Sequence, residues 1–180
     1  TSQQQAAQQL AARKAMGAAG ALGSGRLPGV GPPPAHITPE IRDKIKQAFD
    51  IAKTEGNKAY ANRHFEAALK HYTIAQRTDQ HNTTGMLHAV LSNVSAVYAS
   101  QGNWQKSFHH AFEAVQLKQD FAKGHSRMAT ALLALQMHQE ARQSFLTSLS
   151  LEPNNRQVLE QLHQVERKLN LPLTPAGAAG

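Results

Sequence analysis

The chain has 180 residues, a net charge of +7 at pH 7 and no cysteine. The absence of cysteine excludes a disulfide scaffold, thiol catalysis and any zinc site with cysteine ligands, and no apolar run reaches the ~20 residues that a membrane-spanning helix needs. The basic charge favours an acidic partner, such as an acidic peptide, a nucleic acid or an anionic membrane, without choosing among them.

Residues 1–37 are predicted to form a disordered arm. The first 36 residues are rich in Gln, Ala, Gly and Pro and contain no Asp or Glu. Such a composition buries too little apolar area to offset chain entropy, so we expect at most a transient helix over 3–16. Without acidic residues, and with Arg13, Lys14 and Arg26, the arm also suits an organelle transit segment, and this alternative stays open. The tail, residues 171–180, is also expected to be disordered.

Residues 38–170 are predicted to form an all-α domain. Thr38 is a suitable N-cap, and Pro39 occupies the first helical position. Apolar residues then recur at intervals of three and four, and polar or Gly- and Pro-containing breakers interrupt the pattern five times. Seven helices of ordinary length are predicted, at about 39–61, 64–78, 85–100, 104–117, 120–135, 138–151 and 154–169.

The helices are short and come in pairs, which indicates a repeat. A 34-residue pattern fits at about 49–82, 88–121 and 122–155, with a final helix at about 154–169. The second and third repeats begin 34 residues apart, whereas the first and second are 39 apart, so the turn between them carries five extra residues. The residues on pattern positions are Gly56, Ala68, Tyr72 and Ala75, then Tyr98 and Ala114, then Ala129, Ala141, Phe145 and Pro153.

Residues 49–169 therefore resemble a three-repeat tetratricopeptide domain with its capping helix, a right-handed α-solenoid. The departures from the family pattern are Ala52, where Trp is usual, and Ser107 and Ala111 in the second repeat. In the capping helix we expect one face to pack on the stack and the other to be in solvent. The packed set is Val158, Leu159, Leu162 and Val165, and the solvated set is Arg156, Glu160, Glu166 and Arg167.

Five polar side chains fall on groove-facing positions of the repeats. They are Lys53, Asn57, Asn93, Lys123 and Arg127. Three cations and two amides on one concave wall can donate charge-assisted hydrogen bonds to carboxylates, and a guanidinium can hold a carboxylate at two points. A C-terminal Asp, which carries two carboxylates close together, suits this set. Asp50 lies three residues before Lys53 and could pair with it.

The five positions resemble the dicarboxylate clamp of co-chaperone tetratricopeptide domains. The resemblance implies a cytoplasmic adaptor, not an enzyme, that binds the C-terminal EEVD of the seventy- and ninety-kilodalton heat-shock chaperones. It also implies that Ala96 and Ala99 leave room for an apolar peptide residue upstream of the acidic end, with Tyr60 and Thr130 as auxiliary groove residues.

Other readings of the sequence have less support. No G-x-S-x-G, H-E-x-x-H or phosphate-loop motif occurs, and no cofactor is expected. Of the ten histidines, His109 and His110 are adjacent and so poorly placed as joint metal ligands, and Trp104 is expected in the core. The rival function is a structural scaffold subunit of a larger assembly, organellar or ribonucleoprotein, although few aromatic residues are available for stacking on bases.

Overall fold

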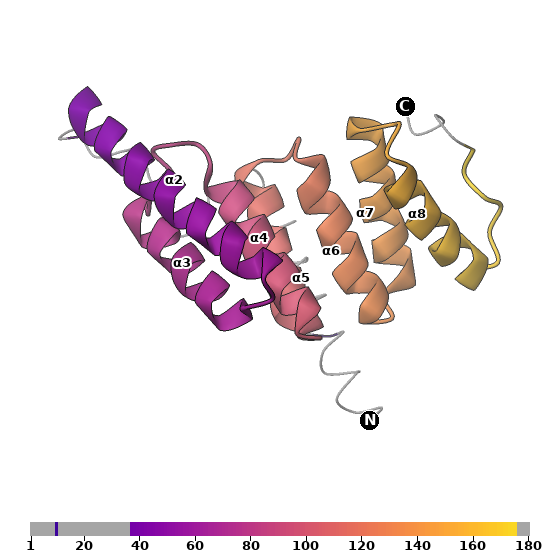
Figure 1. Cartoon of the computed structure of the whole chain (residues 1–180). Coiled ribbons are helices and arrows are strands. Elements are labelled where there is room, and N and C mark those ends of the chain that lie inside the picture. The colour runs from indigo at the N-terminus through magenta and orange to yellow at the C-terminus, as the bar shows by residue number, and fades with distance from the viewer. Residues whose placement is uncertain (1–9, 11–36, 176–180) are drawn as a thin grey trace.

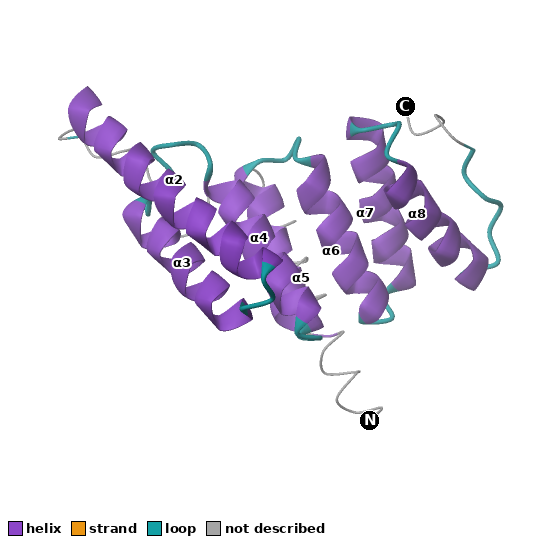
Figure 2. Ribbon diagram, in the orientation of Figure 1, coloured by secondary structure: helices purple, strands orange, loops and turns teal. Residues whose placement is uncertain are grey.

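The computed structural model describes Leu10 and residues 37–175 of the chain. Expectations for the rest of residues 1–36 lie outside the described residues. The described helices are α2 (Pro39–Ala61), α3 (Phe65–Thr78), α4 (Leu87–Ser100), α5 (Trp104–Leu117), α6 (Ala122–Ala134), α7 (His138–Leu151) and α8 (Arg156–Lys168). Residues 37–175 contain no strand (Figure 2). The predicted all-α fold and its seven helices are confirmed, with boundaries that move by two residues at most.

The helices stack in chain order, as three pairs followed by α8 (Figure 1). Within each pair the two helices are joined by a tight turn and lie against each other, and α4 contacts both α2 and α6. Thr38 caps α2 as predicted, because its Oγ1 accepts a hydrogen bond from the N–H of Ile41. The first part of α2 extends beyond α3, because the helix begins ten residues before the first repeat pattern (Figure 1).

Small residues allow the paired helices to approach closely. Ala68 and Ala141 are fully buried where the second helix of a pair crosses the first. Position 56 has room only for glycine, because a Cβ there would lie 2.5 Å from Cε1 of Tyr72. Tyr72 is itself almost fully buried, so the two residues fill one space between α2 and α3.

In the second repeat, Ser107 and Ala111 stand where the family pattern has a small residue and an aromatic residue. Ser107 and Ala111 are both buried, and the Ser107 hydroxyl lies 3.1 Å from that of Ser95, which occupies the position of Gly56 in its own repeat. A buried hydroxyl needs a hydrogen-bond partner, and each serine supplies the other's. The departures from the pattern therefore keep the helices packed.

The five extra residues between the first two repeats form an ordered turn around Asp79. Its buried carboxylate accepts hydrogen bonds from the N–H groups of Thr83 and Thr84, at 2.5 and 3.1 Å, and from the Thr84 hydroxyl. The Asn82 side chain then accepts from the N–H of Leu87, the first residue of α4. The turn thus fixes where the groove-lining α4 begins.

One expectation about the capping helix was wrong. Glu166 was expected in solvent, but it is fully buried, and its carboxylate is satisfied by Arg142, which donates at 3.3 Å, and by Thr174, which donates to both oxygens. The disorder expected for the tail stays a prediction, although Thr174 contacts α8 through these bonds and through His163, whose Nε2 lies 2.7 Å from the Thr174 carbonyl. Residues 176–180 lie outside the described residues.

Candidate peptide-binding groove

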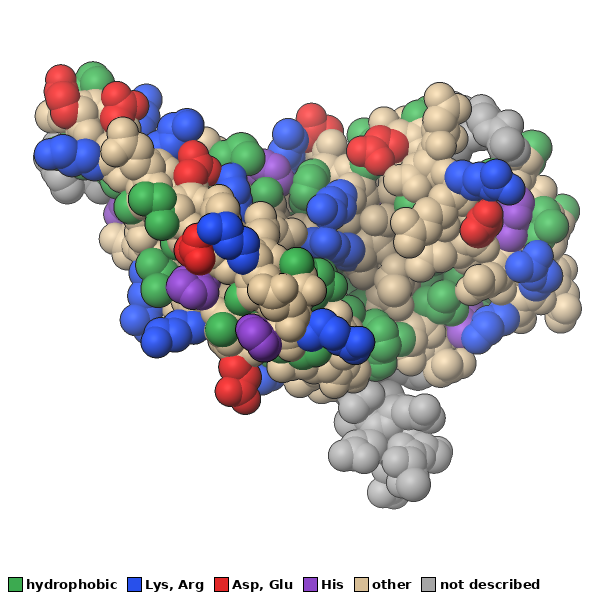
Figure 3. All heavy atoms as spheres, viewed as in Figure 1, with side chains coloured by type: hydrophobic (Ala, Val, Ile, Leu, Met, Phe, Trp, Pro, Cys, Tyr) green, Lys and Arg blue, Asp and Glu red, His purple; other side chains and the backbone are tan. Residues whose placement is uncertain are grey.

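The first helices of the repeats, α2, α4 and α6, supply the polar side chains of the groove. Figure 3 shows Lys and Arg side chains around the hollow in the middle of this face of the molecule. Each of the five residues predicted for the clamp lies on one of these three helices.

Asn57 joins the first two repeats. Its Oδ1 accepts a hydrogen bond from the Tyr72 hydroxyl at 2.8 Å and one from Nδ2 of Asn93 at 2.9 Å. Burial raises the pKa of Tyr72, which keeps the phenol protonated and able to donate. Because the oxygen of Asn57 is engaged twice, its orientation is fixed, and its NH₂ group is the part that it offers to a ligand.

Arg127 joins the second and third repeats. Its Nη1 donates to Oδ1 of Asn93 at 3.2 Å, to the Ser92 hydroxyl at 2.7 Å and to the Ser92 carbonyl. Burial lowers the pKa of the Arg127 guanidinium, although an arginine remains charged in proteins. None of its described hydrogen bonds uses Nε or Nη2, so these donors remain to face an incoming carboxylate.

Lys123 lies one helical turn before Arg127 on α6. Repulsion from Arg127, with some burial, lowers the pKa of the Lys123 amine, while Glu152 opposes the shift. Like charges placed together in this way are unfavourable in the free protein, and an anion that sits between them relieves the repulsion. The pair is therefore suited to hold a negatively charged ligand.

Lys53 is the member of the five that is paired with a carboxylate. Its Nζ lies 2.8 Å from Oδ1 of Asp50, as the sequence predicted, and 5.5 Å from the centroid of the Phe49 ring. Only 22% of the Lys53 side chain is exposed, so the amine is held close to the α2 surface. It lies four residues, about one helical turn, from Asn57 on the same helix.

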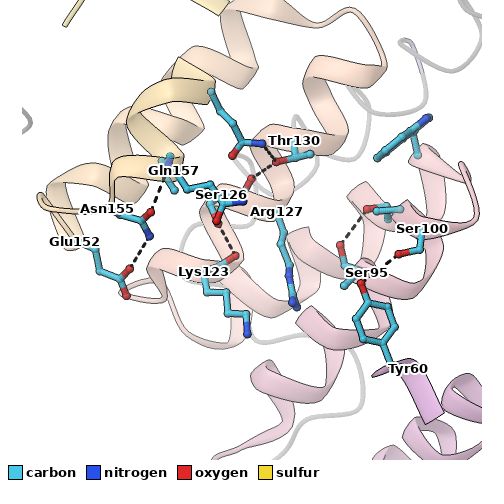
Figure 4. Close-up of a pocket in the computed structure, with 16 residues that line it drawn as sticks. Tyr60, Ser95, Ser100, Lys123, Ser126, Arg127, Thr130, Glu152, Asn155 and Gln157 are labelled. Atoms are coloured by element: carbon cyan, nitrogen blue, oxygen red, sulfur yellow. Dashed lines mark hydrogen bonds between the residues drawn. The ribbon is translucent and has the colours of Figure 1, made fainter. Parts of the chain in front are cut away.

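A pocket of about 650 Å³ begins at Lys123 and Arg127 and extends over the concave face of α6 (Figure 4). All four auxiliary residues predicted for the groove line it, namely Tyr60, Ala96, Ala99 and Thr130. Lys53, Asn57 and Asn93 do not. The structure thus places the five clamp residues in two overlapping groups: a chain of hydrogen bonds from Asn57 through Asn93 to Arg127, and a pocket that Arg127 and Lys123 share.

Several pocket residues were missed in the sequence. Trp104, which was expected in the core, packs against the core cluster while half-buried at the start of α5, and it also forms part of the pocket wall. The far side of the pocket comes from α8 and the turn before it, and its residues are Glu152, Asn155, Gln157, Val158 and Gln161. No motif in the sequence marks these positions, because the packing of the capping helix on α7 and α6 decides which of them face the groove.

The histidines lie apart from the clamp network. His109 and His110 both approach Glu113, at 3.5 and 2.9 Å. Within residues 37–175 and at Leu10, no three His, Asp or Glu side chains are grouped in a way that could hold a metal ion. His125 bonds to the Gln119 carbonyl, at 2.8 Å.

No helix in the described part of the chain has the length and apolarity needed to cross a membrane.

Comparison with curated proteins finds relatives over the helical region. The chain is 33% identical over 125 residues to the heat shock protein sti1 homolog of Schizosaccharomyces pombe, covering 69% of this chain and 20% of that protein. It is 28% identical over 123 residues to the Hsp70-Hsp90 organising protein of Plasmodium falciparum, covering 68% of this chain and 47% of that protein. The chain thus spans less than half the length of these relatives. No protein-family model matches it.

Solved structures share the architecture. The first tetratricopeptide domain of Spaghetti (RPAP3), bound to the HSP90 peptide SRMEEVD, is 26% identical with a TM-score of 0.64, covering 69% of this chain and 94% of that one. The Sgt2 tetratricopeptide domain from Aspergillus fumigatus is 25% identical with a TM-score of 0.60, covering 78% and 85%. With three stacked helix pairs, a capping helix and these relatives, the described region is a tetratricopeptide-repeat domain similar to those of the Sti1-type organising proteins and of RPAP3.

Proposed function

We propose that the groove binds the acidic C-terminal peptide, of the EEVD type, of seventy- or ninety-kilodalton heat-shock chaperones. Lys53, Asn57, Asn93, Lys123 and Arg127 would hold the two carboxylates of the last residue. In this proposal the chain is an adaptor module without catalytic activity, and it acts in the cytoplasm, where such chaperones are found.

The observation that carries the proposal is the hydrogen-bonded line from Asn57 to Asn93 to Arg127. It joins three repeats through side chains, with distances of 2.9 and 3.2 Å. Two further cations, Lys53 and Lys123, lie on the helices that carry Asn57 and Arg127. A set of donors whose orientations are already fixed loses little conformational entropy when a ligand binds. Because the donors include three cations, the ligand best matched to them is a compact dianion.

The relatives support the same partner. The structure of the RPAP3 domain holds an HSP90 peptide that ends in EEVD, and several curated relatives are named as Hsp70-Hsp90 organising proteins. A short peptide contributes few contacts and must be ordered on binding, so we expect micromolar affinity, about −8 kcal/mol. Affinity should fall with added salt, since the contact is between charges.

The test is a titration of the full chain with a labelled peptide that ends in EEVD, followed by fluorescence anisotropy. Lys123→Ala and Arg127→Ala should each weaken binding by ~2 kcal/mol or more, because each removes one partner of a charge pair. The matched control is Lys70→Ala, which removes an exposed cation from α3, away from the pocket lining. Equal affinity of the three variants would contradict the proposal.

A further inference from the structure

The three repeats differ at two equivalent positions, one in the core of the second helix and one on the groove side of the first helix. In repeat order, the pairs at these positions are Tyr72 with Asn57, Ala111 with Ala96, and Phe145 with Thr130. Of the three repeats, the first alone combines a phenol hydroxyl with a carboxamide, and the two groups are hydrogen-bonded at 2.8 Å. Phe145 is fully buried without a hydroxyl, so the core itself needs only the ring at this position.

The Tyr72 ring lies close to α2 and cannot shift toward it. A Cβ at Gly56 would lie 2.5 Å from Cε1 and 2.7 Å from Cδ1 of the ring. In the other two repeats the residue at this place is Ser95 or Ala129, each with a Cβ. The glycine thus lets the ring approach the helix, and the hydroxyl reaches Asn57, the next residue along α2.

Arg127 determines which way the two groove amides face. A guanidinium only donates, so Asn93 must turn its Oδ1 toward Arg127, at 3.2 Å. Nδ2 of Asn93 then faces Asn57, whose Oδ1 accepts from it at 2.9 Å. The Tyr72 hydroxyl adds a second donor to the same oxygen. The NH₂ group of Asn57 is consequently the end that is left for a ligand, and donors from α3 and α4 hold it in that orientation.

We infer that Tyr72 is a positioning residue of the groove, whose buried hydroxyl holds the carboxamide of Asn57 with its NH₂ group toward the carboxylates of the peptide. The inference rests on the proposed function, and it gives α3, which supplies no clamp residue, a part in binding. Asn57 is exposed and Asn93 is itself a half-buried groove side chain, whereas Tyr72 is fixed by the core. A side chain that is already held in its bound orientation loses less rotamer freedom when the ligand arrives.

The first test is Tyr72→Phe, which removes the hydroxyl and retains the ring. We expect the affinity of the full chain for a labelled EEVD peptide to fall about threefold or more, the cost of ordering one side chain on binding. The matched control is Tyr98→Phe, because the Tyr98 ring stacks on His110 and lies outside the pocket lining. The control should bind as tightly as wild type. Equal affinity of wild type and Tyr72→Phe would overturn the inference while the clamp stands, whereas absence of binding to the wild-type chain would contradict the proposed function.

The second test separates positioning from packing by repeating Tyr72→Phe in the Asn57→Ala background. If Tyr72 acts through Asn57, its hydroxyl should have no further effect once the amide is gone, whereas a role in packing would weaken binding by the same factor in both backgrounds. NMR relaxation of the Asn57 side-chain NH₂ in the free protein gives a readout that needs no peptide. The group should be more mobile in Tyr72→Phe than in wild type or Tyr98→Phe. Equal factors in the two backgrounds, or unchanged mobility, would overturn the inference, and the mobility alone decides if Asn57→Ala binds too weakly to titrate.

Discussion

Arg127 in α6 donates from Nη1 to Oδ1 of Asn93 in α4, at 3.2 Å. The two residues belong to different repeats, and the bond places a guanidinium beside an amide that is itself bonded to Asn57. The groove is therefore organised before any ligand arrives, and its parts can be changed one at a time.

Arg127 should contribute to binding far more than to stability. A half-buried cation without an anionic partner among the described residues is costly to desolvate, and this cost offsets the hydrogen bonds that it makes. We expect Arg127→Met to change the free energy of unfolding by less than about 1 kcal/mol while peptide affinity falls at least ~10-fold. Urea unfolding and anisotropy titration measure the two effects, and a large loss of stability would assign Arg127 to the fold.

Peptide binding should be sensitive to an isosteric substitution of Asn57. Asn57→Asp retains the oxygen that accepts from Tyr72 and Asn93, but it replaces the NH₂ donor with negative charge. The circular dichroism spectrum should be unchanged, and affinity for an EEVD peptide should fall ~10-fold or more, since like charges at a binding site cost several kcal/mol. Asp50→Asn, which removes the partner of Lys53, should act in the opposite direction and strengthen binding. Equal effects of the two variants would contradict the assignment.

Gly56 should tolerate no side chain while Tyr72 is present. Although alanine is a better helix former than glycine, the added Cβ would lie 2.5 Å from the Tyr72 ring and displace it from Asn57. Gly56→Ala should destabilise the domain by about 1–3 kcal/mol, as overpacking does. In the double variant Gly56→Ala, Tyr72→Leu, the added methyl group should cost much less than it does alone. Additive effects in denaturant unfolding would show that the two residues are not coupled.

Peptide affinity should fall at alkaline pH because Lys123 loses its proton there. Its pKa is lowered in the free protein, first by Arg127 and then by burial, and a bound dianion would raise it. Binding should therefore take up protons once the pH reaches the lowered pKa, and affinity should fall as the pH rises further. Lys123→Arg should remove this dependence, because arginine keeps its charge. Titrations over an alkaline series measure the slope, and identical slopes would contradict the role of Lys123.

Glu166 should stabilise the capping helix in a pH-dependent manner. Burial raises its pKa, but the two hydrogen bonds from Thr174 and the charge of Arg142 outweigh that effect, and the net pKa lies below the ordinary 4.5. A carboxylate with a lowered pKa contributes stability above its unfolded pKa and loses it as the pH falls through the folded value. The stability difference between wild type and Glu166→Gln should therefore be full at pH 7 and shrink below about pH 4.5. A constant difference would contradict this account.

The fold and most of the groove could be predicted because both follow the repeat register. Apolar spacing set the helices, and once Gly56 fixed the first repeat, the groove positions of Lys53, Asn93 and Arg127 followed from the period. Where contacts are not repeated, prediction failed. The buried Glu166 is bonded to Thr174, in the segment that follows α8, and Glu152 in the pocket wall is bonded to Asn155 of the same turn. Such contacts depend on one turn or one chain end, and no periodic pattern encodes them.

The most direct test of the central claim compares three peptides that differ only at the chain end. One ends in EEVD as the free acid, one is its C-terminal amide, and one ends in EEVN as the free acid. If Asn57, Asn93, Lys123 and Arg127 hold two carboxylates, the free acid should bind with micromolar affinity and each change should weaken binding at least ~10-fold. Equal affinity for the free acid and the amide would show that the groove does not recognise a doubly anionic chain end.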